Sequence, residues 1–242
     1  MKLHVIIYLS LLLFAGSGCS DFLDVQPKDK QSEEQLFATR GGFYTAVNGI
    51  YNKLAGSTLY GKNLTYEMID ILAFRYTPLS VNKYYTALVK PDYTDETVEA
   101  NLSSIWSSAY ATILNCNVLL KNLEISTGVL NEQEKKVLTG EALALRAFLH
   151  LDMLRLFGPV YVKNPSAEAI PYNESDKVSA LPILAADTVM GRVLRGINAR
   201  DRTGGYGFTG RRSGSVLALS SIAIQLLCCF GIKSPGVFVC RG

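Results

Sequence analysis

The sequence predicts an all-α protein made of antiparallel helical pairs, and three observations support this prediction. Apolar residues recur at spacings of three and four in several long stretches of the chain. Two of these stretches, 101–125 and 131–157, are joined by a short turn that contains Gly128. The second stretch is apolar on two faces, as expected for a helix that is packed between neighbours.

The amino-terminal segment predicts export and attachment to a lipid. A positively charged start precedes an apolar run over 3–15, and small residues then lead to Cys19. This arrangement is typical of a secretory signal peptide, and the cysteine resembles that of a bacterial lipobox, whose thiol carries acyl chains such as palmitate. Gly16 stands where the lipobox usually has leucine, so an ordinary signal with an unrelated cysteine is the alternative. We expect a signal peptide over 1–18 and an acidic, polar tether over 19–35.

The charge distribution argues against nucleic acid as a partner. Residues 1–194 contain 17 basic and 20 acidic side chains, whereas residues 195–242 contain seven basic side chains and one acidic side chain. A mildly acidic body lacks the basic surface that binds a phosphate backbone. The five cysteines have neither the paired spacing of a zinc site nor the even spread of a disulfide framework. We therefore expect no metal and no other cofactor.

The first part of the mature chain is expected to contain two helices and a long loop. A helical period runs over 33–54, and the pair Gly41 and Gly42 is a candidate break in it. A second helix is expected over 64–74. Two prolines and the polar residues between them predict a long loop over 76–97.

The helix expected over 131–157 has clear ends. The side chain of Asn131 can accept hydrogen bonds from free backbone amides, and acidic residues follow it in the first turn. Gly158 and Pro159 stop the helix. Together with the helix over 101–125 it resembles one tetratricopeptide unit, although the strict repeat signature is absent.

The charged residues of this two-faced helix need partners. At ~100° per residue, Glu141, Asp152 and Arg155 lie on one narrow side. Arg146 and His150 lie on nearly the opposite side. Charges that are buried between helices must be paired to be tolerated. We therefore interpret the four charged side chains as helix-to-helix contacts, and His150 as a structural polar contact and not as a catalytic base.

The same helix resembles the central motif of the SusD/RagB family. The segment GEALALRAFLHLDMLRLFGPV over 140–160 carries the motif's Leu-Arg-Ala at 145–147 and its final Phe-Gly at 157–158. Three further segments resemble the family in the right order: the mature amino terminus over 19–24, the first helix over 42–51, and the helix before the motif with Trp106, Tyr110, Asn115 and Asn117. The resemblance covers about residues 19–194.

The resemblance implies binding and transport. Members of this family are lipoproteins on the outer face of the outer membrane, and they are mostly helical with tetratricopeptide-like units. They bind glycans or other nutrients without cleaving them and deliver them to a SusC-like TonB-dependent transporter. We therefore expect a lipid-anchored cell-surface protein whose partners are an oligosaccharide and this transporter. A helical-repeat adaptor of the outer membrane that binds proteins or peptides is the alternative.

Catalysis is not expected. No Ser-His-Asp order, paired-acid motif or glycine-rich phosphate loop is visible in the sequence. We therefore expect a binding protein and not an enzyme.

Tyrosines in and near the long loop are candidates for glycan contacts. Sugar sites use flat aromatic faces and planar polar groups, and loops on a rigid scaffold often carry binding sites. The alternative is that these tyrosines pack the loop onto the helices or contact the transporter. The candidate ligand-binding residues are Asp70, Arg75, Tyr76, Tyr84, Tyr85 and Tyr93.

Residues 195–242 depart from the pattern of the family. An amphipathic helix begins near Asp187, but residues 195–215 are rich in glycine, arginine and serine, and an apolar run follows over 216–232. We expect an incomplete SusD-like helical domain over 36–194 and an aberrant tail that is out of frame or disordered. A transmembrane helix over 216–232 is a further alternative. We expect such a truncated chain to be poorly stable, and a chain without function is one alternative.

Overall fold

The structure, a computed structural model, describes residues 32–75, 82–90 and 92–202, with side chains as far as Asn198. The chain divides into two units, residues 1–36 and residues 37–242. The expected features that lie outside the described residues are the signal peptide, Cys19, the tether as far as residue 31, Tyr76, and the tail after residue 202 with its apolar run over 216–232.

The described part of the first unit is the start of helix α2 (Glu33–Phe37). Ser32 Oγ accepts a hydrogen bond from the Gln35 N–H at 3.2 Å, and Gln35 Oε1 accepts one from the Ser32 N–H at 3.3 Å. This reciprocal exchange satisfies two backbone donors at the start of a helix. The first turn of α2 therefore lies within the last residues of the expected tether.

Helix α3 (Arg40–Leu54) begins directly after Thr39. Thr39 has an extended backbone, and its side chain accepts a hydrogen bond from the Gly42 N–H at 3.1 Å. The predicted division of this stretch into two helices is confirmed. The predicted position of the break is wrong, because Gly41 and Gly42 lie inside α3. The larger apolar side chains buried on this helix are Phe43, Val47, Ile50 and Leu54.

Helix α4 (Met68–Leu72) is much shorter than the helix predicted over 64–74. The chain before it turns around the carbonyl of Lys62, which accepts hydrogen bonds from the backbone N–H groups of residues 65–67. The Thr65 hydroxyl donates to the same carbonyl at 3.1 Å. Because these donors converge on one acceptor, they do not form a regular helical ladder. The first half of the predicted helix is therefore wrong.

Helix α5 (Lys83–Val89) occupies part of the segment predicted to be a loop over 76–97. Asn82 caps this helix by accepting a hydrogen bond from the Tyr84 N–H at 3.0 Å. Ala87 and Leu88 are buried. The loop prediction is therefore wrong over this helix, where a cap and a buried apolar pair outweigh the prolines on either side.

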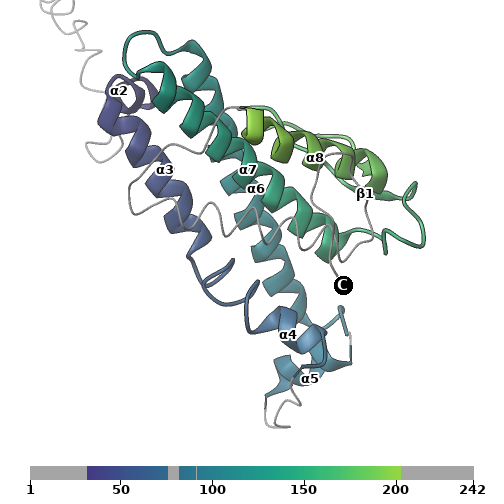
Figure 1. Cartoon of the computed structure of the whole chain (residues 1–242). Helices are drawn as coiled ribbons and strands as arrows, with labels where there is room; N and C mark the ends of the chain where they lie inside the picture. Colours follow the sequence, from purple (N-terminus) through teal and green to yellow (C-terminus); the bar gives the residue numbers. More distant parts are fainter. Residues whose placement is uncertain (1–31, 76–81, 91, 203–242) are drawn as a thin grey trace, which may run out of the picture. The chain divides into compact units, whose positions relative to one another are not determined.

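Helices α6 (Glu96–Ile125) and α7 (Glu132–Phe157) form the central antiparallel pair (Figure 1). α6 starts five residues earlier than predicted because Asp95 accepts hydrogen bonds from the backbone N–H groups of residues 97 and 98. The predicted bounds of α7 are confirmed. Asn131 Oδ1 accepts a hydrogen bond from the Glu134 N–H at 2.8 Å, and Glu134 Oε2 accepts one from the Asn131 N–H at 3.3 Å.

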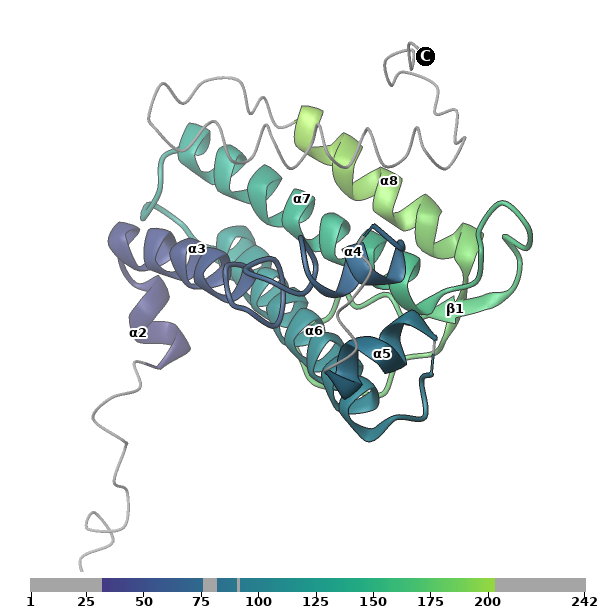
Figure 2. The same ribbon diagram turned by 90° about the horizontal axis from the view of Figure 1, so that it is seen from below.

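The second half of α7 is buried on all sides. Every residue from Leu145 to Leu154 is buried, and such a stretch covers the whole circumference of a helix. α6 contacts one side of α7 and α8 contacts another, and Figure 2 shows both neighbours beside it. The prediction of a helix packed between neighbours is therefore confirmed.

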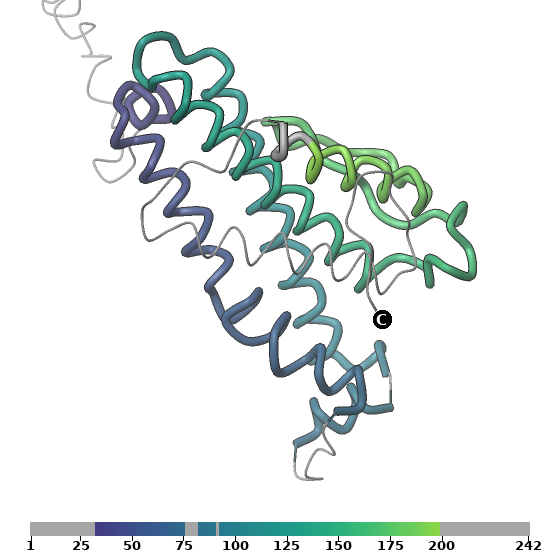
Figure 3. The backbone as a smooth tube through the Cα atoms, viewed as in Figure 1, coloured from purple at the N-terminus to yellow at the C-terminus, as the bar shows by residue number. Residues whose placement is uncertain are grey.

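The chain after α7 returns as a short hairpin and a helix. Strand β1 (Glu168–Ile170) pairs antiparallel with β2 (Leu184–Ala185), with Glu168 opposite Ala185 and Ile170 opposite Leu184. Helix α8 (Ala186–Arg202) follows directly and packs along α7 (Figure 3).

α8 continues past the point at which the aberrant tail was expected to begin. Gly196 lies so close to α7 that an added Cβ would be 3.0 Å from the Ala147 Cβ. Ile197 is buried as well. Residues just beyond 194 therefore contribute to the packing against α7.

The all-α class is confirmed, because helices make up almost all of the regular structure within the described ranges. None of the helices in these ranges combines the length and the apolar character that crossing a membrane requires.

We expect Gly196→Leu to lower the free energy of unfolding by about 1–3 kcal/mol, because the larger side chain must displace α7. Chemical denaturation measures this change. Gly191→Leu is the matched control in the same helix, because an added Cβ there meets nothing closer than 4.0 Å. Equal stability of the two variants would mean that α8 does not pack on α7 at residue 196.

Candidate functional site

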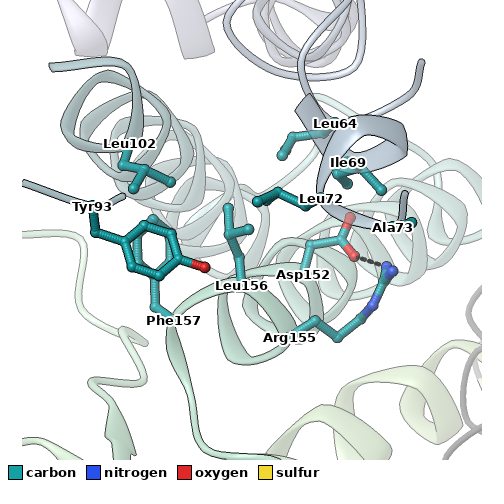
Figure 4. Close-up of a pocket in the computed structure, with 10 residues that line it drawn as sticks. All are labelled: Leu64, Ile69, Leu72, Ala73, Tyr93, Leu102, Asp152, Arg155, Leu156 and Phe157. Atoms are coloured by element: carbon teal, nitrogen blue, oxygen red, sulfur yellow. Dashed lines mark hydrogen bonds and ion pairs between the residues drawn. The ribbon is translucent and has the colours of Figure 1, made fainter. Parts of the chain in front are cut away.

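A pocket of about 620 Å³ lies between α4, the start of α6 and the last turns of α7 (Figure 4). Asp152, Arg155 and Leu156 reach it from one face of α7, because they are spaced by three and four residues. Tyr93 reaches it from the turn before α6. The full lining is Leu64, Ile69, Leu72, Ala73, Tyr93, Leu102, Asp152, Arg155, Leu156 and Phe157.

A half-buried ion pair forms the polar part of this lining. Arg155 Nη1 donates to Asp152 Oδ1 at 2.6 Å, and the Tyr60 hydroxyl donates to Asp152 Oδ2 at 2.7 Å. Burial raises the pKa of Asp152 above its ordinary value, and the Arg155 guanidinium and the Tyr60 hydroxyl oppose that rise. The Asp152 side chain is 6% exposed and that of Arg155 is 29% exposed. A ligand would therefore meet the arginine before the carboxylate.

Two aromatic side chains, Tyr93 and Phe157, also line the pocket. Tyr93 is 55% exposed, so its ring is open to a ligand. Phe157 packs against Trp106. The two rings meet edge to face with 4.9 Å between the ring centroids. The remaining lining is aliphatic and comes mainly from α4 and the residues on either side of it.

Tyr84 and Tyr85 do not line this pocket. The Tyr85 hydroxyl donates to Glu67 Oε1 at 2.6 Å, and the Tyr84 hydroxyl accepts a hydrogen bond from Asn101 Nδ2. Burial raises the pKa of Tyr84 to about 12. Both side chains thus hold α5 against its neighbours, which is the alternative that the sequence left open for the tyrosines.

Asp70 and Arg75 also lie outside the pocket lining. Arg75 Nε and Asp70 Oδ1 are 3.5 Å apart, and the arginine side chain is 72% exposed. Of the six candidate ligand-binding residues, the structure brings only Tyr93 to the pocket, while Tyr76 lies outside the described residues.

The sequence could not have revealed the pocket. Helical spacing places Asp152 and Arg155 on one face, which the wheel shows. Nothing local indicates that Tyr93 faces them, because that proximity depends on how the chain before α6 folds over α7.

Arg146 lies in a separate interior network. Its Nη1 donates to Asn117 Oδ1 at 2.9 Å, and its Nη2 donates to Glu174 Oε1 at 3.2 Å. Asn117 Nδ2 donates in turn to the carbonyls of Asn173 and Ser175 at 3.1 and 2.9 Å. The arginine therefore ties α6 and the segment 173–175 to α7. Glu141 has a similar role, because it accepts a hydrogen bond from the Tyr51 hydroxyl at 2.6 Å.

His150 is held as a neutral imidazole. Its Nδ1–H donates to the Arg146 carbonyl at 2.8 Å, and its Nε2 accepts a hydrogen bond from the Asn173 N–H at 3.0 Å. The ring stacks on Tyr172 with 3.8 Å between the centroids. Burial lowers the pKa of His150 to about 3. Because both nitrogens are occupied, His150 connects segment 172–173 to α7.

Gly158 ends α7 and lies close to the last turn of that helix. A Cβ at this position would lie 2.5 Å from the Leu154 carbonyl oxygen, so the turn requires glycine. Within the described ranges, no three histidine, cysteine, aspartate or glutamate side chains gather in a way that could hold a metal ion.

The comparison with known families identifies the class of protein. A family model for SusD-like proteins, described as starch-binding and associating with the outer membrane, matches residues 21–189. The chain therefore belongs to the SusD-like family, and the predicted resemblance is confirmed.

Individual relatives agree with this family. SusD-like protein P2 of Formosa agariphila is 28% identical over 188 residues, which cover 75% of this chain and 35% of that protein. A SusD-like protein of Bacteroides ovatus is 27% identical over 162 residues, which cover 64% of this chain and 27% of that protein. The chain thus spans about a third of the length of the curated relatives that it matches.

A solved structure supports the fold. The crystal structure of a SusD-like carbohydrate-binding protein from Bacteroides vulgatus matches with a TM-score of 0.57 at 17% identity, covering 82% of this chain and 46% of that chain.

We expect Arg146→Ala to lower the free energy of unfolding by about 2 kcal/mol, because it leaves the buried Asn117 Oδ1 without its donor. Thermal or chemical denaturation measures this loss. Glu174→Gln is the control and should cost less than about 1 kcal/mol, because the Glu174 side chain is 51% exposed. An unchanged stability of Arg146→Ala would contradict a structural role.

We expect the stability to fall on acidification because of His150. The unfolded chain protonates the imidazole below pH 6.5, whereas the folded protein does so only near pH 3. Between these values, the His150 contribution to the free energy of unfolding falls by ~1.4 kcal/mol for each unit of decreasing pH. Denaturation at pH 4–7 measures the slope for the wild type and for His150→Gln. Identical slopes would show that His150 is exposed or already charged.

Proposed function

We propose that this protein is a cell-surface lipoprotein, anchored through Cys19, that binds a glycan and delivers it to a SusC-like TonB-dependent transporter of the outer membrane. Membership of a family described as starch-binding and associating with the outer membrane supports the class of ligand and the membrane. The signal and lipobox pattern before Cys19 supports the anchor.

The proposed glycan-binding site is the pocket at the end of α7. A pyranose ring has a face of C–H groups and an edge of hydroxyl groups. Tyr93 offers an exposed flat ring for the C–H face, while Arg155 can donate to a hydroxyl and Asp152 can accept from one. Because the ion pair fixes both polar groups before binding, little side-chain entropy is lost when the ligand arrives.

The polar lining supports binding without cleavage. Glycoside hydrolysis generally uses two carboxyl groups on either side of the scissile bond. Among the residues that line this pocket, Asp152 is the one carboxylate, and Arg155 and Tyr60 hold it by hydrogen bonds. Such a carboxylate is suited to orienting a hydroxyl and not to acid–base chemistry.

A second candidate is the helical-repeat adaptor that binds proteins or peptides. The observation that favours it is the aliphatic part of the pocket, which could take an apolar side chain of a partner. The residues that form this part are Leu64, Ile69, Leu72, Ala73, Leu102 and Leu156.

We also propose that the residues after α8 form an aberrant, out-of-frame tail. Gly196 and Ile197 pack against α7 as part of that helix. Resequencing of the coding DNA tests the frame, and an intact frame that yields the same tail in related strains would contradict this proposal.

Titration calorimetry with malto-oligosaccharides, the fragments of starch, tests the binding site. We expect Tyr93→Ala to weaken binding about twofold to tenfold, since an aromatic contact contributes roughly 0.5–1.5 kcal/mol. Tyr66→Ala is the matched control, because Tyr66 is 59% exposed but does not line the pocket. Binding that is equally strong in both variants would rule out this pocket. Binding of apolar peptides with no binding of oligosaccharides would favour the adaptor.

A further inference from the structure

Phe74 combines two features that are each unfavourable for a phenylalanine. Among the described residues it is the one non-glycine residue with a positive φ, at 54°. Its side chain is also highly exposed, with 67% of the residue surface open to solvent. A residue with a Cβ is strained in this left-handed region, and an exposed ring gains nothing from burial.

The local hydrogen bonds hold the backbone of Phe74 in this conformation. α4 ends at Leu72 with Ala73 as its carboxy-terminal cap. The Phe74 N–H donates to the Ile71 carbonyl at 3.0 Å, and the Arg75 N–H donates to the Asp70 carbonyl at 2.9 Å. These two bonds form a Schellman motif, in which the position of Phe74 is usually glycine. Strain of this kind persists where the surrounding structure enforces it, and it is frequent at ligand-binding sites.

This strained residue lies beside the pocket. Ala73, the residue directly before Phe74, lines the pocket, and Figure 4 shows it near the Asp152–Arg155 ion pair. Tyr93, which is 55% exposed, lines the same pocket. An exposed aromatic ring next to Ala73 is therefore in a position to extend the pocket lining toward solvent.

We propose that Phe74 is a ligand-contacting residue whose ring stacks on a pyranose unit of an oligosaccharide held in the pocket at the end of α7. This inference rests on the proposed glycan-binding function and deepens it. It assigns the ligand to chains of several sugars, because a monosaccharide in the pocket does not need a second aromatic ring outside it. The strained backbone is the cost of presenting the ring, since glycine would fit the motif better.

Stability and binding of Phe74 variants test this proposal together. Phe74→Gly removes both the strain and the ring, so we expect the melting temperature to rise by about 2–4 °C. We expect its affinity for maltoheptaose to fall about fivefold to tenfold, while its affinity for maltose changes less than twofold. Phe74→Trp keeps an aromatic ring and should bind maltoheptaose within about twofold of the wild type.

Each alternative outcome has a distinct meaning. If the wild type binds maltoheptaose and Phe74→Gly binds it equally well, the Phe74 inference is overturned while the proposed function stands. The same holds if Phe74→Gly lowers the melting temperature, because the ring is then structural. If the wild type binds neither sugar whereas it binds an apolar peptide, the proposed function itself fails, and the inference fails with it.

Discussion

The burial of the second half of α7 on all sides is the constraint on which the rest of the structure depends. A helix in this position can bury apolar residues at little cost, but each polar or charged group on it must find a partner inside the protein. Arg146, His150 and Asp152 all lie in the fully buried stretch. Their partners come from several segments, namely α6, the segment 172–175 and the turns before α4.

These polar partners connect the segments around α7 and contribute to the pocket wall. His150 and Arg146 hold the segment 172–175 against α7, and this segment leads toward β2 and α8. Asp152 binds Tyr60 on one oxygen and Arg155 on the other, and this arrangement places a fixed ion pair at the pocket wall. Because buried charges need partners, the same contacts both connect the scaffold and fix polar groups at the pocket wall.

The sequence predicts the parts of the structure that local chemistry decides. Asn131 and Gly158 mark the ends of α7, and the spacing of apolar residues indicates a helix with two packed faces. The sequence does not predict the parts of the structure that depend on contacts between distant segments, and one local signal was also missed. The cap at Asn82 is a local signal that the flanking prolines obscured. The contact of Tyr93 with the pocket could not be predicted, because the sequence does not show where the turn before α6 lies relative to α7.

Residues beyond 194 illustrate the same limit. The amino-acid composition changes abruptly there, yet Gly196 and Ile197 pack on α7. This packing is visible in the structure and not in the sequence.

The most direct test of glycan binding at the end of α7 is a crystal structure of the protein with a bound malto-oligosaccharide. We expect the sugar in the pocket at the end of α7, with Tyr93 against a ring face and Arg155 at a hydroxyl. A sugar bound elsewhere, with this pocket empty, would contradict the account.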